Sequence, residues 1–245
     1  MKLIRRAGDC FRVLVGTSLL LTALTGCALH TKQDVETVST VGGHGANPAV
    51  ARPTVTDPRS LGRDDAPIVI VEYSDYQCPY CSQFHTNVLP KLRSVYIDTG
   101  KVRLIFRDLP LAIHRESVPA AITAHCAAEQ GKFWEMNAAL FAKYRELGSE
   151  LYERLVLTLN LDTDKFGTCV QSPSSGKSVQ RDMQEARRYG LKSTPSFIFG
   201  RFDKGKVAIH RAASGYADFE TLAREIDNLL ATTPASGERL LPVQK

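Results

Sequence analysis

The sequence predicts a mixed α/β domain in which a helical segment separates two strand-containing halves. A continuous β-branched run at 68–71 and an alternating run at 102–107 predict strands in the first half. An apolar run at 196–199 predicts a strand in the second half, and between the halves apolar residues recur at helical spacing. The 245 residues are 43% hydrophobic, which is enough to build a core and excludes a chain that is disordered throughout.

The charge of the chain gives no support to nucleic-acid binding. The formal net charge is +5, but residues 1–26 hold four basic residues and one acidic residue, so the remainder carries 5 − 3 = +2. That remainder shows no basic patch with interleaved aromatic residues. We therefore predict no nucleic-acid partner.

The N-terminus has the pattern of an export signal. A basic start precedes an apolar stretch of about twelve residues, Val13 to Leu24, too short to cross a bilayer about 30 Å thick. Leu24-Thr25-Gly26-Cys27 then resembles the lipobox of bacterial lipoproteins, in which the cysteine is lipidated. We predict a lipoprotein signal peptide over 1–26 and a lipid on Cys27. The alternatives are an ordinary signal peptide and an uncleaved anchor.

The segment after Cys27 is expected to be a tether. It is polar, contains several glycines and prolines and has no apolar periodicity, so it cannot build a core. We assign residues 27–63 to a flexible polar tether and residues 233–245 to a C-terminal tail. Removal of the signal peptide and lipidation of Cys27 would leave four thiols, which are Cys78, Cys81, Cys126 and Cys169.

A Cys-x-x-Cys motif follows the first predicted strand. Cys78-Pro79-Tyr80-Cys81 precedes a helical stripe of Phe84, Val88, Leu92 and Val95, so the motif opens a helix. The N–H groups and positive dipole end of that helix would stabilise a thiolate on Cys78, which we expect to be the exposed nucleophile. Cys81, one turn inside, could close or resolve a disulfide.

Metal chemistry is a weaker interpretation of the same motif. Zinc needs about four ligands and no second Cys-x-x-Cys pair is present, while c-type haem attachment needs histidine directly after Cys81, where Ser82 stands. We interpret His85 as a surface residue of the helix rather than a ligand. We therefore predict no metal site and no cofactor.

The second half begins with a proline in an unusual position. Pro195 directly precedes the apolar strand that starts at Ser196, and a hairpin near 203–205 leads into a returning strand. A helical stripe follows: Phe219, Leu222, Ala223, Ile226, Leu229 and Leu230. Residues 113–188 between the halves read as helices, and Asp162 is a plausible N-cap in that region.

Together these segments resemble the DsbA-like thiol:disulfide oxidoreductases of the thioredoxin superfamily. The resemblance covers residues 64–231 and rests on DAPIVIVEYSDYQCPYC, CAAEQGKFWEMNAALF and GLKSTPSFIFG. It implies a thioredoxin fold formed by residues 64–112 and 189–232, with residues 113–188 as a helical insertion between its two halves.

The resemblance also implies roles for single residues. Pro195 matches the cis-proline that faces the active-site disulfide, and Thr194 matches the residue that touches both substrate and the active-site sulfurs. Glu72, six residues before Cys78, takes the place of a buried acid that could move the proton of Cys81; the alternative is a surface glutamate. Thr194 and the Pro79-Tyr80 dipeptide differ from the residues that the strongest oxidants of the family have at these positions. The resemblance therefore does not predict whether the enzyme oxidises, reduces or isomerises disulfides.

Cys126 and Cys169 are expected to form a structural disulfide. The active-site motif accounts for the other pair, an exported protein with even cysteines usually has them joined, and some DsbA-like relatives carry a second disulfide in the insert. Two free buried thiols are the alternative.

The predicted function is that of an exported enzyme anchored to a membrane by its lipid. Its partners would be exported proteins with cysteines and a membrane redox partner, in the periplasm or on the extracytoplasmic face of the cell membrane. We expect a monomer because no dimerisation domain is evident. A Cu(I)-handling metal chaperone is the alternative, since thiolates are soft ligands, and a non-catalytic chaperone-like binder is a third possibility.

Overall fold

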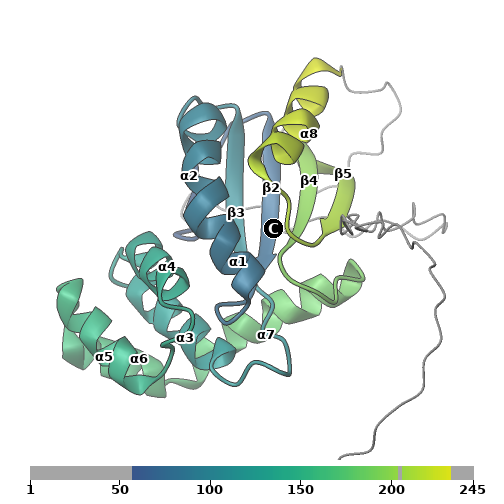
Figure 1. Cartoon of the computed structure of the whole chain (residues 1–245). Helices are drawn as coiled ribbons and strands as arrows, with labels where there is room; N and C mark the ends of the chain where they lie inside the picture. The colour runs from purple at the N-terminus through teal and green to yellow at the C-terminus, as the bar shows by residue number, and fades with distance from the viewer. Residues whose placement is uncertain (1–56, 204–205, 233–245) are drawn as a thin grey trace, which may run out of the picture. The chain divides into compact units, whose positions relative to one another are not determined.

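The computed structural model of the chain describes residues 57–203 and 206–232 (Figure 1). The predicted signal peptide, Cys27, most of the predicted tether and the predicted tail at 233–245 lie outside these residues. Within the described part, no helix is both long and apolar enough to cross a bilayer.

A five-stranded sheet in the order β1-β3-β2-β4-β5 forms the centre of the fold. The strands are β1 Ser60–Leu61, β2 Ile68–Ser74, β3 Val102–Asp108, β4 Ser196–Asp203 and β5 Lys206–Ser214. Strands β2 and β3 run parallel, and the other neighbouring pairs are antiparallel. Every residue of β2 and β3 is buried, as expected for central strands covered on both faces.

One long helical run connects β2 to β3. It consists of α1 Pro79–Gln83, a π-helical segment Phe84–Val88, α2 Leu89–Leu92 and a second π-helical segment Arg93–Ile97. Each π turn holds more residues than an α turn and so rotates the buried stripe around the helix axis. Val95, predicted on the buried stripe, is therefore 41% exposed, whereas Tyr96 and Ile97 are buried in its place.

Each face of the sheet has its own core. Ile70, Leu104 and Phe199 pack with the α1–α2 run and with α8 Phe219–Ala231, and Figure 1 shows these helices together on one face. On the opposite face Val71 and Ile198 pack with Ala186 of α7 Pro173–Arg188. The alternation of side chains along β2 produces this division.

The helical insert lies between β3 and β4 in the chain. It comprises α3 Ser117–Ala128, α4 Phe133–Ala142, α5 Ser149–Thr158, α6 Thr163–Gln171 and α7. Asp162 caps α6 by accepting from the backbone N–H groups of Asp164 and Lys165, which confirms the predicted N-cap. A disulfide between Cys126 and Cys169 joins α3 to α6. The fold is thus a thioredoxin fold with a helical insertion.

The predicted end of the tether is wrong. Residues 57–63 belong to the folded domain, because β1 pairs with β3 and Phe106 donates its backbone N–H to the Arg59 carbonyl. A Cβ atom at Gly62 would lie 2.5 Å from the Val102 carbonyl oxygen, so glycine permits this close approach. Apolar periodicity could not predict the segment, since ion pairs and backbone hydrogen bonds hold it in place.

Ion pairs attach this N-terminal segment to α7. Arg59 Nη1 lies 2.5 Å from Asp182 Oδ2 on α7, and Arg107 Nη1 lies 2.9 Å from Asp57 Oδ2. These four side chains are between 6% and 13% exposed. The first residues of the folded domain therefore connect the sheet to the helical insert.

Candidate active site

Cys78 and Cys81 are free thiols at the carboxyl end of β2. Strand β2 ends at Ser74, and the following turn is closed by the Cys78 N–H, which donates to the Asp75 carbonyl at 3.0 Å. Cys78 is then the N-cap of α1, and Pro79 occupies the first helical turn, where its missing N–H leaves no bond unmade. The local sequence therefore sets both sulfur atoms at the start of the helical run.

The two thiols have opposite acidities. The pKa of Cys78 is lowered to about 6, and the largest cause is a hydrogen bond from the Cys81 thiol. Burial acts in the opposite direction and raises this pKa, whereas hydrogen bonds from Thr194 and from the backbone N–H groups of Cys81 and Tyr80 lower it further. Burial, together with the hydrogen bond to Cys78 and the charge of its thiolate, raises the pKa of Cys81 well above its ordinary value. At neutral pH Cys78 is mainly a thiolate and Cys81 a thiol.

A loop from the second half of the fold covers Cys78. When Cys78 is protonated, its thiol donates to the backbone carbonyl of Thr194, with sulfur and oxygen 3.4 Å apart, and the Thr194–Pro195 peptide bond is cis. The loop leads directly into β4, beside β2. Cys78 is only 4% exposed, so the expectation of an exposed nucleophile is wrong: the neighbouring loop recesses it.

Glu72 and His85 form a buried pair beneath the motif. His85 Nε2 lies 2.9 Å from Glu72 Oε1, and the exposed fractions of the two side chains are 2% and 0%. The expectation that His85 is a surface residue is therefore wrong, because the π-helical segment turns it toward the sheet. Its ring stacks on Phe141 of α4, with centroids 3.8 Å apart.

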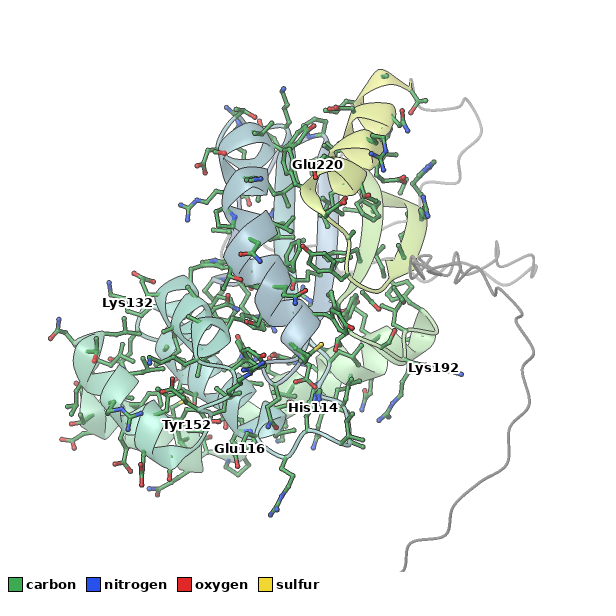
Figure 2. All side chains as sticks on the ribbon, in the orientation of Figure 1. His114, Glu116, Lys132, Tyr152, Lys192 and Glu220 are labelled. Atoms are coloured by element: carbon green, nitrogen blue, oxygen red, sulfur yellow. A yellow bond between two sulfur atoms is a disulfide. The ribbon has the colours of Figure 1, made fainter. Side chains whose placement is uncertain are left out.

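Asp75 binds several groups around the turn before Cys78, which its sequence context did not predict. Its buried carboxylate accepts from the N–H groups of Gln77 and Leu111 at 2.8 Å, from the Ser117 hydroxyl, and from His114 Nδ1 at 2.8 Å. These contacts join the turn before Cys78 to the loop before α3, where Figure 2 shows His114 and Glu116. The one feature of the sequence that could have indicated this role is the position of Asp75, three residues before Cys78.

A cluster of potential metal ligands lies at the end of β3. Side-chain atoms of Asp108, His125 and Asp182 lie within 4.8 Å of one another. The Arg59 guanidinium lies 2.5 Å from Asp182 and 3.5 Å from Asp108, while His125 Nε2 lies 2.6 Å from Asp108. The Arg59 guanidinium is therefore already paired with both carboxylates.

Comparison with known proteins decides the family. The thioredoxin family model matches residues 54–212. The crystal structure of alpha-DsbA1 from Wolbachia pipientis is similar with a TM-score of 0.64 and 31% identity, over 72% of this chain and 92% of that one. The chain belongs to the DsbA-like thiol:disulfide oxidoreductase family of the thioredoxin superfamily.

Two kinds of curated protein are similar to this DsbA-like chain. A probable disulfide bond formation protein D from Bacillus cereus is 30% identical over 168 residues, which are 62% of this chain and 77% of that protein. The Na(+)/H(+) antiporter NhaA 3 of Salinispora tropica is 36% identical over 150 residues, or 60% of this chain. The match covers 22% of the antiporter, so the chain corresponds to about a fifth of that protein's length.

Proposed function

We propose that this DsbA-like protein is an exported, lipid-anchored enzyme that exchanges disulfides with exported proteins through Cys78 and Cys81. The single observation that carries the proposal is the pair of free thiols with opposite pKa shifts beside the Thr194–Pro195 loop. A low pKa makes Cys78 a nucleophile and a good leaving group, whereas the raised pKa of Cys81 keeps it protonated until it reacts.

The reaction moves two electrons between a protein dithiol and the active-site disulfide. In the oxidising direction a substrate thiolate attacks Cys78 Sγ, the bond to Cys81 breaks, and Cys81 leaves with the electron pair and takes up a proton. The second substrate thiolate then attacks the sulfur of the first substrate cysteine in the mixed disulfide. This forms the substrate disulfide and releases Cys78 as a thiolate. Thr194 and Pro195 would hold the substrate backbone beside Cys78, and Glu72 would exchange the proton of Cys81.

The pKa of Cys78 bears on the direction of the reaction. A lower pKa stabilises the reduced enzyme and makes its disulfide a stronger oxidant. A pKa of about 6 lies between the values of about 7 for thioredoxin and 3.5 for DsbA. We therefore expect a reduction potential between about −270 and −120 mV.

Equilibration with glutathione buffers of known potential tests the proposal. The protein with Cys78–Cys81 oxidised should also form disulfides in a reduced, unfolded secretory protein, and Cys78→Ser should abolish this. A protein that retains its fold but transfers no disulfides in either direction would contradict the proposal. Measurement of copper in the purified reduced protein distinguishes the metal-chaperone alternative.

The environment of the enzyme follows from its proposed export. Cys27 would carry the lipid, and the domain would act on the extracytoplasmic side of a bacterial membrane, as a monomer. After each cycle a membrane redox partner would restore the working state of Cys78 and Cys81. In a Gram-negative host this site is the periplasm.

A further inference from the structure

Two buried polar side chains of β2 lie on the same face as the active-site helix. Glu72 and Ser74 are fully buried, and because they are two residues apart they share one side of the strand, with Cα atoms about 6.6 Å apart. Glu72 Oε2 and Ser74 Oγ make no hydrogen bond of ordinary geometry within the described part of the chain. Buried polar atoms are normally satisfied, so both are available to a group that changes during the reaction.

Ser74 is in contact with the resolving cysteine. Its hydroxyl lies close enough to the Cys81 sulfur to lower the pKa of Cys81, although burial outweighs this effect. The contact is looser than a full hydrogen bond, because Ser74 Oγ has no partner at ordinary hydrogen-bond geometry among the described residues. It therefore has room to tighten when charge develops on Cys81.

His85 binds Glu72, the member of this group that lies farther from Cys81 along β2. It binds Glu72 Oε1 at 2.9 Å, stacks on Phe141, and meets Phe84 and Phe106 at steep interplanar angles of 84° and 71°. In such an apolar site a lone carboxylate is costly, and a shared proton gives the pair a net charge of zero. The aromatic rings fix the imidazole in the one position where it can share that proton.

We propose that Ser74 and His85 are positioning residues for proton transfer at Cys81, with Ser74 linking the thiol to Glu72 and His85 keeping one shared proton on Glu72. This inference rests on the proposed disulfide exchange and deepens it. Neither residue carries a role in the mechanism described above, in which Glu72 acts alone.

The proton of Cys81 moves along these side chains during the cycle. When the active-site disulfide is intact, the pair of Glu72 and His85 holds the shared proton. Attack of a substrate thiolate on Cys78 releases Cys81 as a thiolate; the Ser74 hydroxyl donates its proton to Cys81 and takes one from Glu72. In the opposite direction Cys81 returns its proton by the same route as its sulfur attacks Cys78 in a mixed disulfide.

The other titratable groups around the pair come from the turn after β2, from β3 and from the active-site motif. Tyr76, in the turn after β2, stays a phenol because burial raises its pKa well above the ordinary value. Asp108, at the end of β3, is bound by His125 at 2.6 Å. Helix α4 contributes the aromatic ring of Phe141, and Cys78 and Cys81 lie at the N-cap and in the first turn of α1. During the Cys81 step Cys78 is bound in the mixed disulfide and does not titrate, so the low pKa of free Cys78 does not enter the pH profile of that step.

Rapid mixing of the reduced protein with glutathione disulfide separates the two chemical steps. Attack by Cys78 forms a mixed disulfide with glutathione, and attack by Cys81 on Cys78 then releases the glutathione. Acid quenching and mass spectrometry between about pH 5.5 and 8.5 give both rates. We expect Ser74→Ala and His85→Gln to slow the Cys81 step about tenfold at pH 7 and to change its pH profile. The Cys78 step should stay within about twofold.

Two further variants complete the test. Ser74→Thr keeps a hydroxyl and should restore the Cys81 step. His125→Gln breaks another histidine–carboxylate pair, which is partly buried, and should not slow that step. Normal Cys81 rates and pH profiles in Ser74→Ala and His85→Gln, or equal slowing in His125→Gln, would overturn the proposal. If His85→Gln does not fold, the comparison of Ser74→Ala with Ser74→Thr decides. Loss of the Cys78 step in the unaltered protein would instead contradict the proposed function.

Discussion

Cys78 and Cys81 have the same side chain and differ only in what surrounds their sulfur atoms. Cys78 receives hydrogen bonds and has a pKa of about 6, whereas burial raises that of Cys81. At pH 6.5 most of Cys78 and almost none of Cys81 is thiolate. We expect iodoacetamide to label Cys78 at least tenfold faster, as measured by peptide mass spectrometry. Equal labelling would contradict the assignment of Cys78 as the nucleophile.

Thr194 is expected to adjust the acidity of Cys78. Its side chain is one of the groups that lower the pKa of Cys78, and valine has nearly the same shape but no hydroxyl. In Thr194→Val the pKa should rise, so the alkylation rate at pH 6 should fall about twofold while the rate at pH 9 stays the same. Thr194→Ser is the matched control. An unchanged pH profile in Thr194→Val would assign the low pKa to the Cys81 thiol and the backbone N–H groups without Thr194.

Only part of the site could be predicted residue by residue. The sequence predicted the positions of Cys78, Cys81 and Pro195 because their spacing and neighbours are distinctive. It did not predict the burial of His85, since an α-helical period assigns that position to the surface. Nor did it predict the role of Asp75, because three of the groups that bind it lie between residues 111 and 117. Contacts between distant segments have no local pattern.

Among the elements, the first strand is where sequence and structure differ most. A chain that begins at Asp57 keeps β1, Arg59 and its ion pair with Asp182; one that begins at Asp64 loses them. Removing one partner of a buried ion pair typically costs about 3–5 kcal/mol. We therefore expect urea unfolding to show a loss of about that size for the shorter chain only. Equal stability of the two chains would show that residues 57–63 contribute nothing to the fold.

The disulfide between α3 and α6 is expected to stabilise the insert. It closes a loop with a sequence separation of 43 residues, which corresponds to about 4 kcal/mol in the chain-entropy treatment. Replacing both Cys126 and Cys169 by alanine should therefore lower the free energy of unfolding by up to that amount. The alkylation rate of Cys78 should not change, because the groups with the largest influence on its pKa belong neither to α3 nor to α6. A change in that rate would reveal coupling between the disulfide and the active site.

At the scale of the whole molecule, the order of elements followed from the sequence, but their attachment to one another did not. Buried strands, the Cys-x-x-Cys helix and the helical insert each have a local pattern that predicts them. The insert shares an apolar core with Phe106 of β3, to which α4 contributes Phe133 and Phe141. Single polar contacts also join it to α1 and to the turn after β2, such as Ser82 Oγ to the Phe141 carbonyl at 2.8 Å and Asn137 Nδ2 to Tyr76 Oη at 3.0 Å. Such pairs are separated by about 60 residues, so no periodicity connects them.

The proposed position of the molecule in the cell depends on Cys27, which lies outside the described residues. Cys27 follows an apolar stretch too short to span a bilayer, so a covalent lipid is the anchor that the sequence favours. Each buried methylene of such a lipid contributes about 0.8 kcal/mol to membrane binding, and several acyl chains together hold a protein firmly.

We expect Cys27→Ser to move the protein from the membrane fraction to the soluble fraction, or to block processing of the signal peptide. Ser18→Ala, within the apolar stretch, is a control that should leave the distribution unchanged. If Cys27→Ser remains in the membrane with its signal peptide removed, the anchor is not a lipid on Cys27.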